Sequence, residues 1–417
     1  MARKTKPSID NSPTRAVPPQ EFTAAVLSDL HAYSDAKPDD APSHYCIKDP
    51  ETDPSKNPIA GLKRLIDNHG LRADALVCPG DLAHQADPLA LQQAWREVNE
   101  LRSRLSASLL APTSGNHDVD SRYVYNDHDA KGYLQTLSPP YPFPQSDLND
   151  RYWSRHFVLL QHSPCSLLVL NSSALHGEGR YGDSKRYEFE HGRVSSYTLA
   201  AIERELVGVE LNPVRVLLCH HHPHQHSELR LGADDLMAGG QQLLELLGSG
   251  RFGRWLVIHG HKHHPKLENA AGGAMSPVVF ASGSLAATLF RELQTVARNQ
   301  FYILTFPYPE YGAMGFVGRF RAWDWCVGQG WLPATERSGL PSEGGFGWRG
   351  DISVLANQLA TIVDTGFVTW ESLKVQRPEL NYLLPQDIST LRQILEFQHS
   401  IKTLPPFGVP VQLGRTS

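Results

Sequence analysis

Histidines and aspartates gather in short segments of this 417-residue chain. Imidazole and carboxylate groups bind metal ions and move protons, so such clusters are where chemistry is expected. Eleven of the 20 histidines fall in four of these segments, around His31, around His117, in the run that begins at His220 and in the run that begins at His259.

Each polar cluster directly follows a short apolar run typical of a buried strand. Functional groups of α/β sheets gather at the carboxyl ends of strands, so we expect five such ends to meet in one crevice. The five sequences are AAVLSDLH (24–31), ALVCPGDLAH (75–84), LLAPTSGNHD (109–118), VRVLLCHHHPHQH (214–226) and WLVIHGHKHH (255–264).

The crevice would offer nitrogen and oxygen ligands and no thiolate, a set that suits Mn, Fe or Zn. Seven ligands are too many for one ion, so we expect two metal ions, with an aspartate able to bridge them. The candidates are Asp29, His31, Asp81, Asn116, one of His220 to His222, and two of His259, His261 and His263.

In their order and spacing, the motifs resemble the signature of the calcineurin-like metallophosphoesterases. The resemblance covers about residues 24–284 and rests on D-x-H (29–31), G-D (80–81), G-N-H-D (115–118), H-x-P (221–223) and G-H-x-H (260–263). It implies an α/β fold of four layers, in which two β-sheets are flanked by helices, followed here by a C-terminal appendage of strands and helices.

The resemblance also implies a ligand set. Metal one would take Asp29, His31, Asp81 and His263, and metal two would take Asp81, Asn116, His221 and His261. The H-x-P pattern selects His221 from the three consecutive histidines. The other nearby histidines would contact the substrate or support the ligands, and they are His84, His220, His222 and His259.

Two such ions would activate a water molecule as hydroxide for attack on a phosphoester. His117 lies beside a ligand, and we expect it to protonate the leaving oxygen or to stabilise its charge. Asp118 would orient that imidazole. His84 would either touch the substrate or lie in solvent.

The favoured substrate is a small nucleotide-type phosphodiester or a cyclic nucleotide, because H-H-P resembles the smaller bacterial-type phosphodiesterases. A phosphomonoesterase, a nuclease, and a scaffold acting through the C-terminal helices are the alternatives. With a net charge of -5, nucleic acid is not the expected partner. The aromatic-rich segment 119–155 could stack a nucleobase, but packing on itself is the favoured interpretation.

Nine apolar runs predict strands, and helical stripes are expected near 59–66, 88–105 and 195–208. Two further helices are expected after the N-caps Asp351 and Asp387. We expect a flexible tail (1–20), a catalytic domain (21–325) and a helical appendage (326–417). The strands are expected near 22–27, 75–78, 109–111, 167–170, 214–219, 255–258, 278–281, 301–306 and 316–323.

No apolar stretch reaches the roughly 18 residues that span a bilayer, and the N-terminal residues resemble no secretion signal. Five widely spaced cysteines disfavour a disulfide framework. We therefore expect a cytoplasmic protein without a membrane partner.

Overall fold

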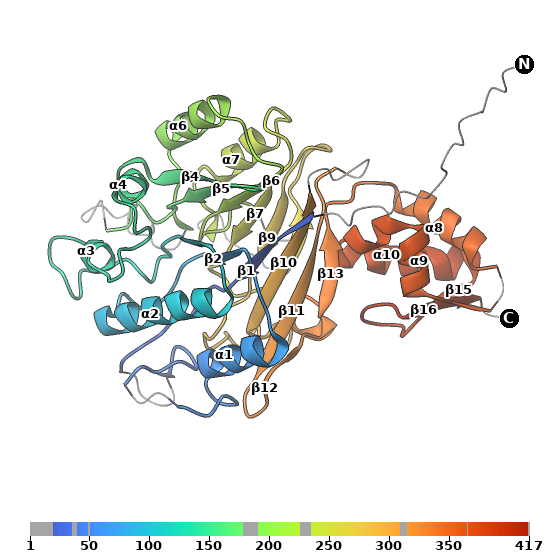
Figure 1. Cartoon of the computed structure of the whole chain (residues 1–417), viewed down its shortest axis with the longest axis horizontal. Coiled ribbons are helices and arrows are strands. Elements are labelled where there is room, and N and C mark those ends of the chain that lie inside the picture. Colours follow the sequence, from blue (N-terminus) through green and yellow to red (C-terminus); the bar gives the residue numbers. More distant parts are fainter. Residues whose placement is uncertain are drawn as a thin grey trace, which may run out of the picture.

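The computed structural model describes residues 20–35, 40–48, 51–177, 191–225, 235–308, 315–364 and 366–415. The expected tail lies outside the described residues, except for Gln20, which begins the first strand. Figure 1 shows a sheet-rich body beside a smaller helical lobe that contains the C-terminal residues.

The first sheet of the body has seven strands. β1 pairs in parallel with β2 and antiparallel with β10, so it lies at the centre of the sheet. The path runs β12 (Gly330–Pro333), β11 (Gly318–Cys326), β10 (Gln300–Tyr308), β1 (Gln20–Val26), β2 (Ala75–Cys78) and β3 (Leu109–Pro112), and β13 (Glu343–Phe346) also pairs with β11.

The second sheet has six strands, and its middle strands β5, β6, β7 and β9 run parallel to one another. Their order is β4 (Phe157–His162), β5 (Cys165–Leu170), β6 (Val214–Leu218), β7 (Leu256–His259), β9 (Val278–Ala281) and β8 (Lys266–Asn269). All nine strands expected from apolar runs are present, with ends that shift by up to three residues.

Helices cover the outer face of each sheet, which makes four layers (Figure 1). α1 (Pro58–His69) and α2 (Pro88–Arg104) pack on the first sheet, while α6 (Ser196–Val207) and α7 (Gly240–Leu247) pack on the second. A third apolar cluster joins the two sheets, for example through Val26 and Ile258. The expected four-layer α/β sandwich is therefore confirmed.

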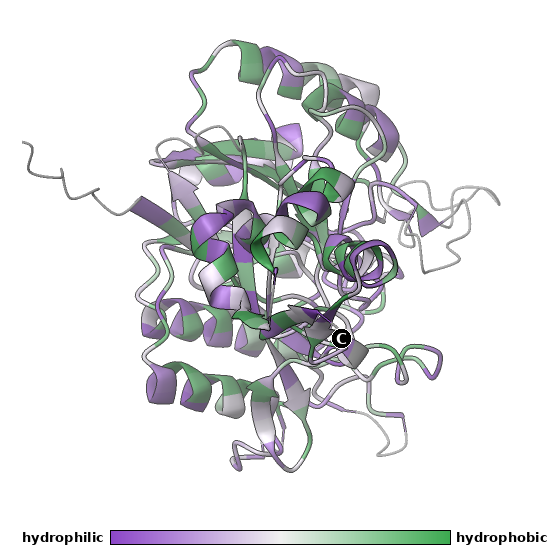
Figure 2. Ribbon diagram, turned by 90° about the vertical axis from the view of Figure 1, so that its right-hand side faces the viewer, coloured by the Kyte–Doolittle hydropathy of each residue, from purple (hydrophilic) through white to green (hydrophobic). Residues whose placement is uncertain are grey.

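Local sequence sets the helix boundaries. Pro88 occupies the first turn of α2, and the Asp87 carboxylate accepts hydrogen bonds from the backbone N–H groups of Leu89 and Ala90. Ser195 caps α6, where its side chain accepts a hydrogen bond from the backbone N–H of Thr198. Figure 2 shows hydrophilic and hydrophobic residues alternating around the helices, as expected for helices with one buried face.

The aromatic-rich segment forms α3 (Gly132–Gln135) and α4 (Ser146–Arg155), and its buried rings join the apolar clusters of the body. Tyr141 and Tyr152 are fully buried, and Phe143 is nearly so. The Tyr152 hydroxyl lies 2.9 Å from the backbone nitrogen of Ser114 and accepts its hydrogen. These rings therefore support the core beneath the site and are not available to stack a ligand.

The expected domain boundary after residue 325 is wrong, because β12 and β13 both pair with β11. The sheet continues to Phe346, and the appendage begins after it. The Gly- and Pro-rich sequence 339–351 does not indicate a strand, although it contains β13.

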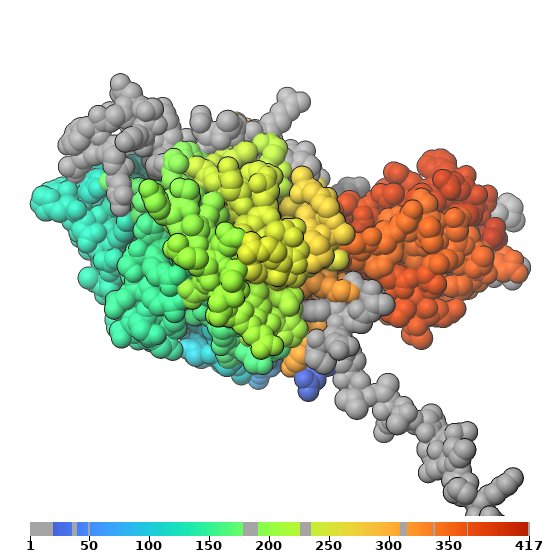
Figure 3. All heavy atoms as spheres, turned by 90° about the horizontal axis from the view of Figure 1, so that it is seen from above, coloured from blue at the N-terminus to red at the C-terminus, as the bar shows by residue number. Residues whose placement is uncertain are grey.

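The appendage, residues 347–415, has its own apolar core and a three-stranded antiparallel sheet, β14-β16-β15. Figure 3 shows it as a separate lobe at one side of the body. Asp351 caps the first helix as expected, whereas Asp387 lies inside the last helix and accepts from the Leu384 N–H. The elements are α8 (Ile352–Ile362), β14 (Phe367–Thr369), α9 (Trp370–Gln376), α10 (Pro385–His399), β15 (Ile401–Leu404) and β16 (Gln412–Arg415).

Within the described residues, no helix combines the length and the apolar character that crossing a bilayer requires.

Candidate active site

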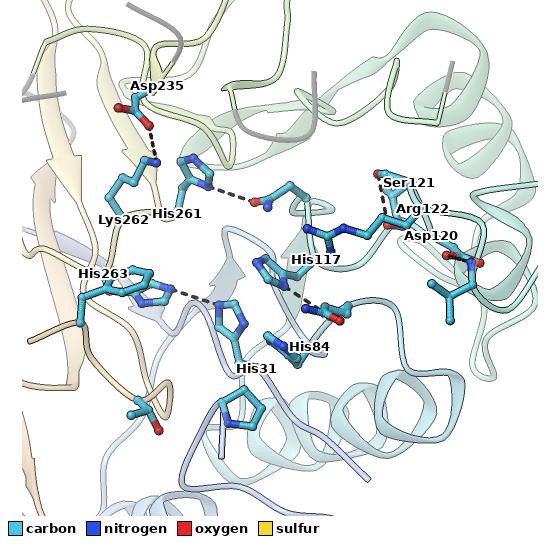
Figure 4. Close-up of a pocket in the computed structure, with 17 residues that line it drawn as sticks. His31, His84, His117, Asp120, Ser121, Arg122, Asp235, His261, Lys262 and His263 are labelled. Atoms are coloured by element: carbon cyan, nitrogen blue, oxygen red, sulfur yellow. Dashed lines mark hydrogen bonds and ion pairs between the residues drawn. The ribbon is translucent and has the colours of Figure 1, made fainter. Parts of the chain in front are cut away.

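The ends of strands from both sheets meet at one cavity of about 400 Å³. Figure 4 shows imidazole rings from separate segments pointing toward one another across this cavity. Six of the candidate residues from the sequence analysis line this cavity: His31, His84, Asn116, His117, His261 and His263. The convergence inferred from five strand endings is therefore present.

Asp81 lies at the centre of the site, and its two oxygens differ. Oδ1 accepts a hydrogen bond of 2.8 Å from the backbone N–H of His117. Oδ2 accepts none and lies 3.4 Å from Nε2 of His31 and 3.3 Å from Nε2 of His220. Burial would raise the pKa of this carboxyl, but His220 and His117 outweigh burial and hold it well below its usual range.

One group of ligand atoms surrounds the His31 side of Asp81. The Nε2 atoms of His31 and His263 are 3.1 Å apart, and Asp29 Oδ1 lies 3.5 Å from Nε2 of His263. All three side chains are buried. Burial, followed by the nearby His117, holds the pKa of His31 well below its usual value, so its imidazole is neutral and able to bind a cation.

A second group surrounds the other side. Oδ1 of Asn116 lies 3.0 Å from Nε2 of His220 and 3.0 Å from Nδ1 of His261. Burial, and after it the neighbouring His221, hold the pKa of His261 well below its usual value. Asn116 Oδ1 thus lies between the two rings, and Nε2 of His220 also faces Oδ2 of Asp81.

The ring that faces Asp81 and Asn116 belongs to His220 and not to His221, the residue selected by the H-x-P pattern. His220 donates its Nδ1–H to the Pro79 carbonyl over 2.9 Å, which turns Nε2 toward the site. His221 instead has Nδ1 2.8 Å from Ser172 Oγ. Strand β6 ends at Leu218, so the side-chain alternation of a strand does not extend to these residues.

Five of the expected ligands have left-handed backbone, which is costly for residues other than glycine. Such strain persists at functional sites because the surrounding fold fixes it. The φ angles are 54° at Asp29, 47° at His31, 55° at Asp81, 85° at His261 and 57° at His263.

Two motif glycines make room for the carboxylates. A Cβ at Gly115 would lie 2.1 Å from Oδ1 of Asp81, and one at Gly260 would lie 2.4 Å from Oδ2 of Asp29. Contacts this short do not occur with real Cβ atoms. The glycines of G-N-H-D and G-H-x-H therefore bring backbone close to the ligands.

His117 lines the cavity with a defined tautomer. Its Nδ1 accepts a hydrogen bond of 3.3 Å from the Gln85 N–H, which leaves the proton on Nε2. Burial lowers the pKa of His117, although Asp81 opposes this. The neutral ring is thus set to donate a hydrogen bond to a leaving oxygen. His84 stacks on it, with ring centroids 5.0 Å apart.

Asp118 does not orient His117, and that expectation is wrong. Its carboxylate accepts backbone N–H bonds from Asp81 at 2.8 Å, Leu82 at 2.7 Å and Gly115 at 2.9 Å, and a longer one from Ala83. Burial and the adjacent Asp81 raise the pKa of Asp118 to about 7. Asp118 therefore ties the two ligand loops together.

The remaining expected histidines divide between the cavity and the core. His84 lines the cavity. His222 and His259 are buried, and their ring centroids lie 4.4 Å apart. Neither is among the residues that line the cavity, so these two support the site from behind.

Among the lining residues that sequence reasoning missed are Arg122, Lys262 and Phe290. Arg122 extends toward His117 (Figure 4), and Lys262 forms an ion pair of 2.6 Å with Asp235. Arg122 follows G-N-H-D by four residues and Lys262 lies inside G-H-x-H, so nearness to a motif was the available signal. Phe290 lies in none of the motifs and next to none of them, so the sequence does not indicate that it lines the cavity.

The residues fit a pair of metal ions. Oδ2 of Asp81 is buried without a hydrogen bond. Ligand atoms of Asp29, His31 and His263 lie within 4.8 Å of one another, and so do those of Asp29, Asp81 and His220 and those of His220, His221 and His261. Two buried ring nitrogens at 3.1 Å are typical of ligands of one cation. A carboxylate oxygen between the two groups suits a bridging ligand.

Comparison with solved structures finds similarity at low sequence identity. A dimetal phosphatase from Danio rerio shares 12% identity at a TM-score of 0.46, over 75% of this chain and 98% of that one. Purple acid phosphatase from yellow lupin (Lupinus luteus) seeds shares 14% identity at a TM-score of 0.45, over 78% of this chain and 54% of that one. No curated protein matches the chain in sequence.

Two family models match the sequence. The model wHTH-Calcineurin_assc, which denotes a winged helix-turn-helix unit, matches residues 344–396, from strand β13 to helix α10 of the appendage. The Calcineurin-like phosphoesterase model matches residues 22–265, which is more than half of the chain and includes all the ligand motifs. The chain belongs to the calcineurin-like phosphoesterase family of metal-dependent hydrolases.

Proposed function

We propose that the protein is a binuclear phosphodiesterase that acts on a small nucleotide-type or cyclic nucleotide substrate. The observation that carries the proposal is Oδ2 of Asp81, which lies at similar distances from His31 and His220 and has no hydrogen bond of its own. An oxygen in this position is close to both groups of ligand atoms, as a bridging ligand must be.

We assign the ligands by this geometry. Asp29, His31, Asp81 and His263 would hold one ion, and Asp81, Asn116, His220 and His261 the other. The ring of His221 also lies within reach of His220 and His261, but we assign His220 because its Nε2 faces both Asp81 and Asn116. The donor atoms suit Mn, Fe or Zn.

A pair of such cations supplies an activated water and offsets the charge of the phosphoryl oxygens. His117 donates a hydrogen bond from Nε2 to the leaving oxygen, because Gln85 occupies its other ring nitrogen. Arg122 extends toward the same place (Figure 4), where it adds positive charge near the phosphate.

The cations of the cavity favour a diester over a monoester. A monoester dianion carries one more negative charge than a diester and needs more positive charge beside the metals. Lys262 is paired with Asp235 at 2.6 Å, and Arg122 is the other Arg or Lys side chain among the described residues that line the cavity.

Hydrolysis of bis(p-nitrophenyl) phosphate against p-nitrophenyl phosphate tests the proposal. The purified protein is assayed first with a chelator and then with added Mn²⁺, and we expect faster, metal-dependent cleavage of the diester. The control is Asp81→Ala, which should lose both metal pairing and turnover. Retained activity in that variant would exclude the two-metal assignment.

The alternatives predict different results. A phosphatase prefers the monoester, and a scaffold that acts through the C-terminal lobe cleaves neither ester although it binds metal. A nuclease binds nucleic acid with strong salt dependence. The winged helix-turn-helix match raises this last option, but basic and acidic side chains are equal in number in residues 347–415. We therefore do not favour it.

A further inference from the structure

A continuous row of flat rings forms one wall of the cavity. His84 stacks on His117 at 5.0 Å, and His117 meets His31 edge to face at 4.6 Å. His31 contacts His263 edge to face at 4.9 Å. Phe290 ends the row, with its ring nearly parallel to His263 at 11° and a centroid distance of 6.1 Å.

Phe290 differs from the other rings in what its chemistry can do. The histidines are proposed ligands or lie beside the leaving oxygen, whereas a phenyl ring neither binds metal nor moves a proton. It is also the one Phe, Tyr or Trp among the described residues that line the cavity. The aromatic residues Tyr141 and Tyr152 of the neighbouring insertion are fully buried and cannot reach a ligand.

The Phe290 side chain is 61% exposed at the edge of this cavity. A single exposed apolar residue needs no explanation on an ordinary surface. Here, however, a second exposed apolar residue lines the same cavity: Val124, whose side chain is 65% exposed. Apolar surface at the rim of a polar site is typical of a pocket that covers part of a ligand.

The cavity that Phe290 lines also contains charged and metal-binding side chains, so one ligand in it meets both kinds of surface. Asp81 and the histidines around it would hold the phosphate, and Arg122 extends toward His117 beside them (Figure 4). The cavity volume of about 400 Å³ falls in the range of small-molecule sites. A phosphate with a flat ring attached would therefore use both parts.

We propose that Phe290 is a stacking platform for a planar ring of the substrate, such as a nucleobase. The inference rests on the proposed function and adds to it a residue that selects the substrate. Stacking of a base on an aromatic side chain contributes about 1–3 kcal/mol, which corresponds to roughly 5- to 150-fold in affinity.

Direct binding tests the platform without requiring turnover. Adenosine 5′-monophosphate and ribose 5-phosphate carry the same phosphate and sugar, but only the first has a planar base. We expect calorimetric titration of the Mn²⁺-loaded protein to show roughly tenfold tighter binding of the nucleotide. Phe290→Ala should remove that difference and leave the affinity for ribose 5-phosphate unchanged, and Phe290→Trp should keep the difference.

The matched control is Phe397→Ala, because Phe397 is 83% exposed on helix α10, away from the cavity. Equal binding of the two ligands to the unchanged protein would overturn the platform, as would a difference that survives in Phe290→Ala. Equal weakening of both ligands would also overturn it, since it would show that Phe290 acts by packing against His263. Absence of hydrolysis would count against the proposed function alone.

Discussion

His220 and His221 are neighbours in the chain with different surroundings. The Nε2 atom of His220 faces Asp81 and Asn116, while His221 uses Nδ1 to contact Ser172. We expect His220→Ala to lose one of two bound Mn²⁺ ions and His221→Ala to keep both. Metal content after gel filtration measures this, and two ions in His220→Ala would contradict our assignment.

His117 interacts with the leaving oxygen in our proposal, not with the metals. We expect His117→Ala to retain both ions and to slow esters of weakly acidic alcohols most, because their leaving oxygen carries the most charge. Rates for a series of aryl and alkyl leaving groups measure this. Equal slowing across the series would argue against the role.

The protonation of His220 couples metal binding to pH. Burial lowers its pKa, but the adjacent Asp81 outweighs burial and raises the pKa of His220 to about 9. Metal binding at Nε2 must release this proton, so the affinity for the second ion should rise with pH up to about 9 and then level off. Titrations with Mn²⁺ between pH 6 and 10 check this, with a slope of about tenfold per pH unit below 9. An affinity independent of pH would contradict it.

At the scale of elements, Asp118 holds the turn after β2 to the turn after β3. Four backbone N–H groups donate to one buried carboxylate, and Asp118→Ala would leave them without a partner. We expect the free energy of unfolding to fall by about 3 kcal/mol or more. Urea denaturation measures this, with exposed Asp150→Ala as the control, and a loss below about 0.5 kcal/mol would contradict it.

Several strands of the sandwich could be predicted because each is a short apolar run that ends where polar residues begin. β2 and β9 begin and end where their apolar runs do. β4 and β8 were missed, because His162 and Lys266 belong to strands whose ends carry polar residues. β13 was missed because its sequence contains Gly344 and Gly345.

The motifs identified the cavity but not all roles within it. The choice between His220 and His221 depends on where the chain turns after β6, and spacing does not encode that turn. The part played by Asp118 depends on backbone N–H directions in the turn at Leu82 and Ala83. Phe290 reaches the cavity only through tertiary packing against His263.

At the scale of the whole molecule, the appendage contacts the body close to Phe346, the last residue of β13. Arg349 donates to the Ser276 carbonyl over 2.8 Å. A cavity of about 550 Å³ lies between the two lobes, and its lining includes His264 and Pro265, which directly follow the proposed ligand His263. The appendage therefore shares a cavity with His264, the residue that directly follows the proposed ligand His263.

Strand β13 covers part of one edge of β11, and β12 covers the rest. A chain shortened after residue 325 would lose both strands and present the unpaired N–H and C=O groups of β11 to other copies. Such an edge recruits further strands and promotes aggregation. We expect a chain that ends at Phe346 to elute as a soluble species in size-exclusion chromatography and one that ends at Trp325 to aggregate. The converse result would show that the appendage, and not these two strands, protects the sheet from polymerising.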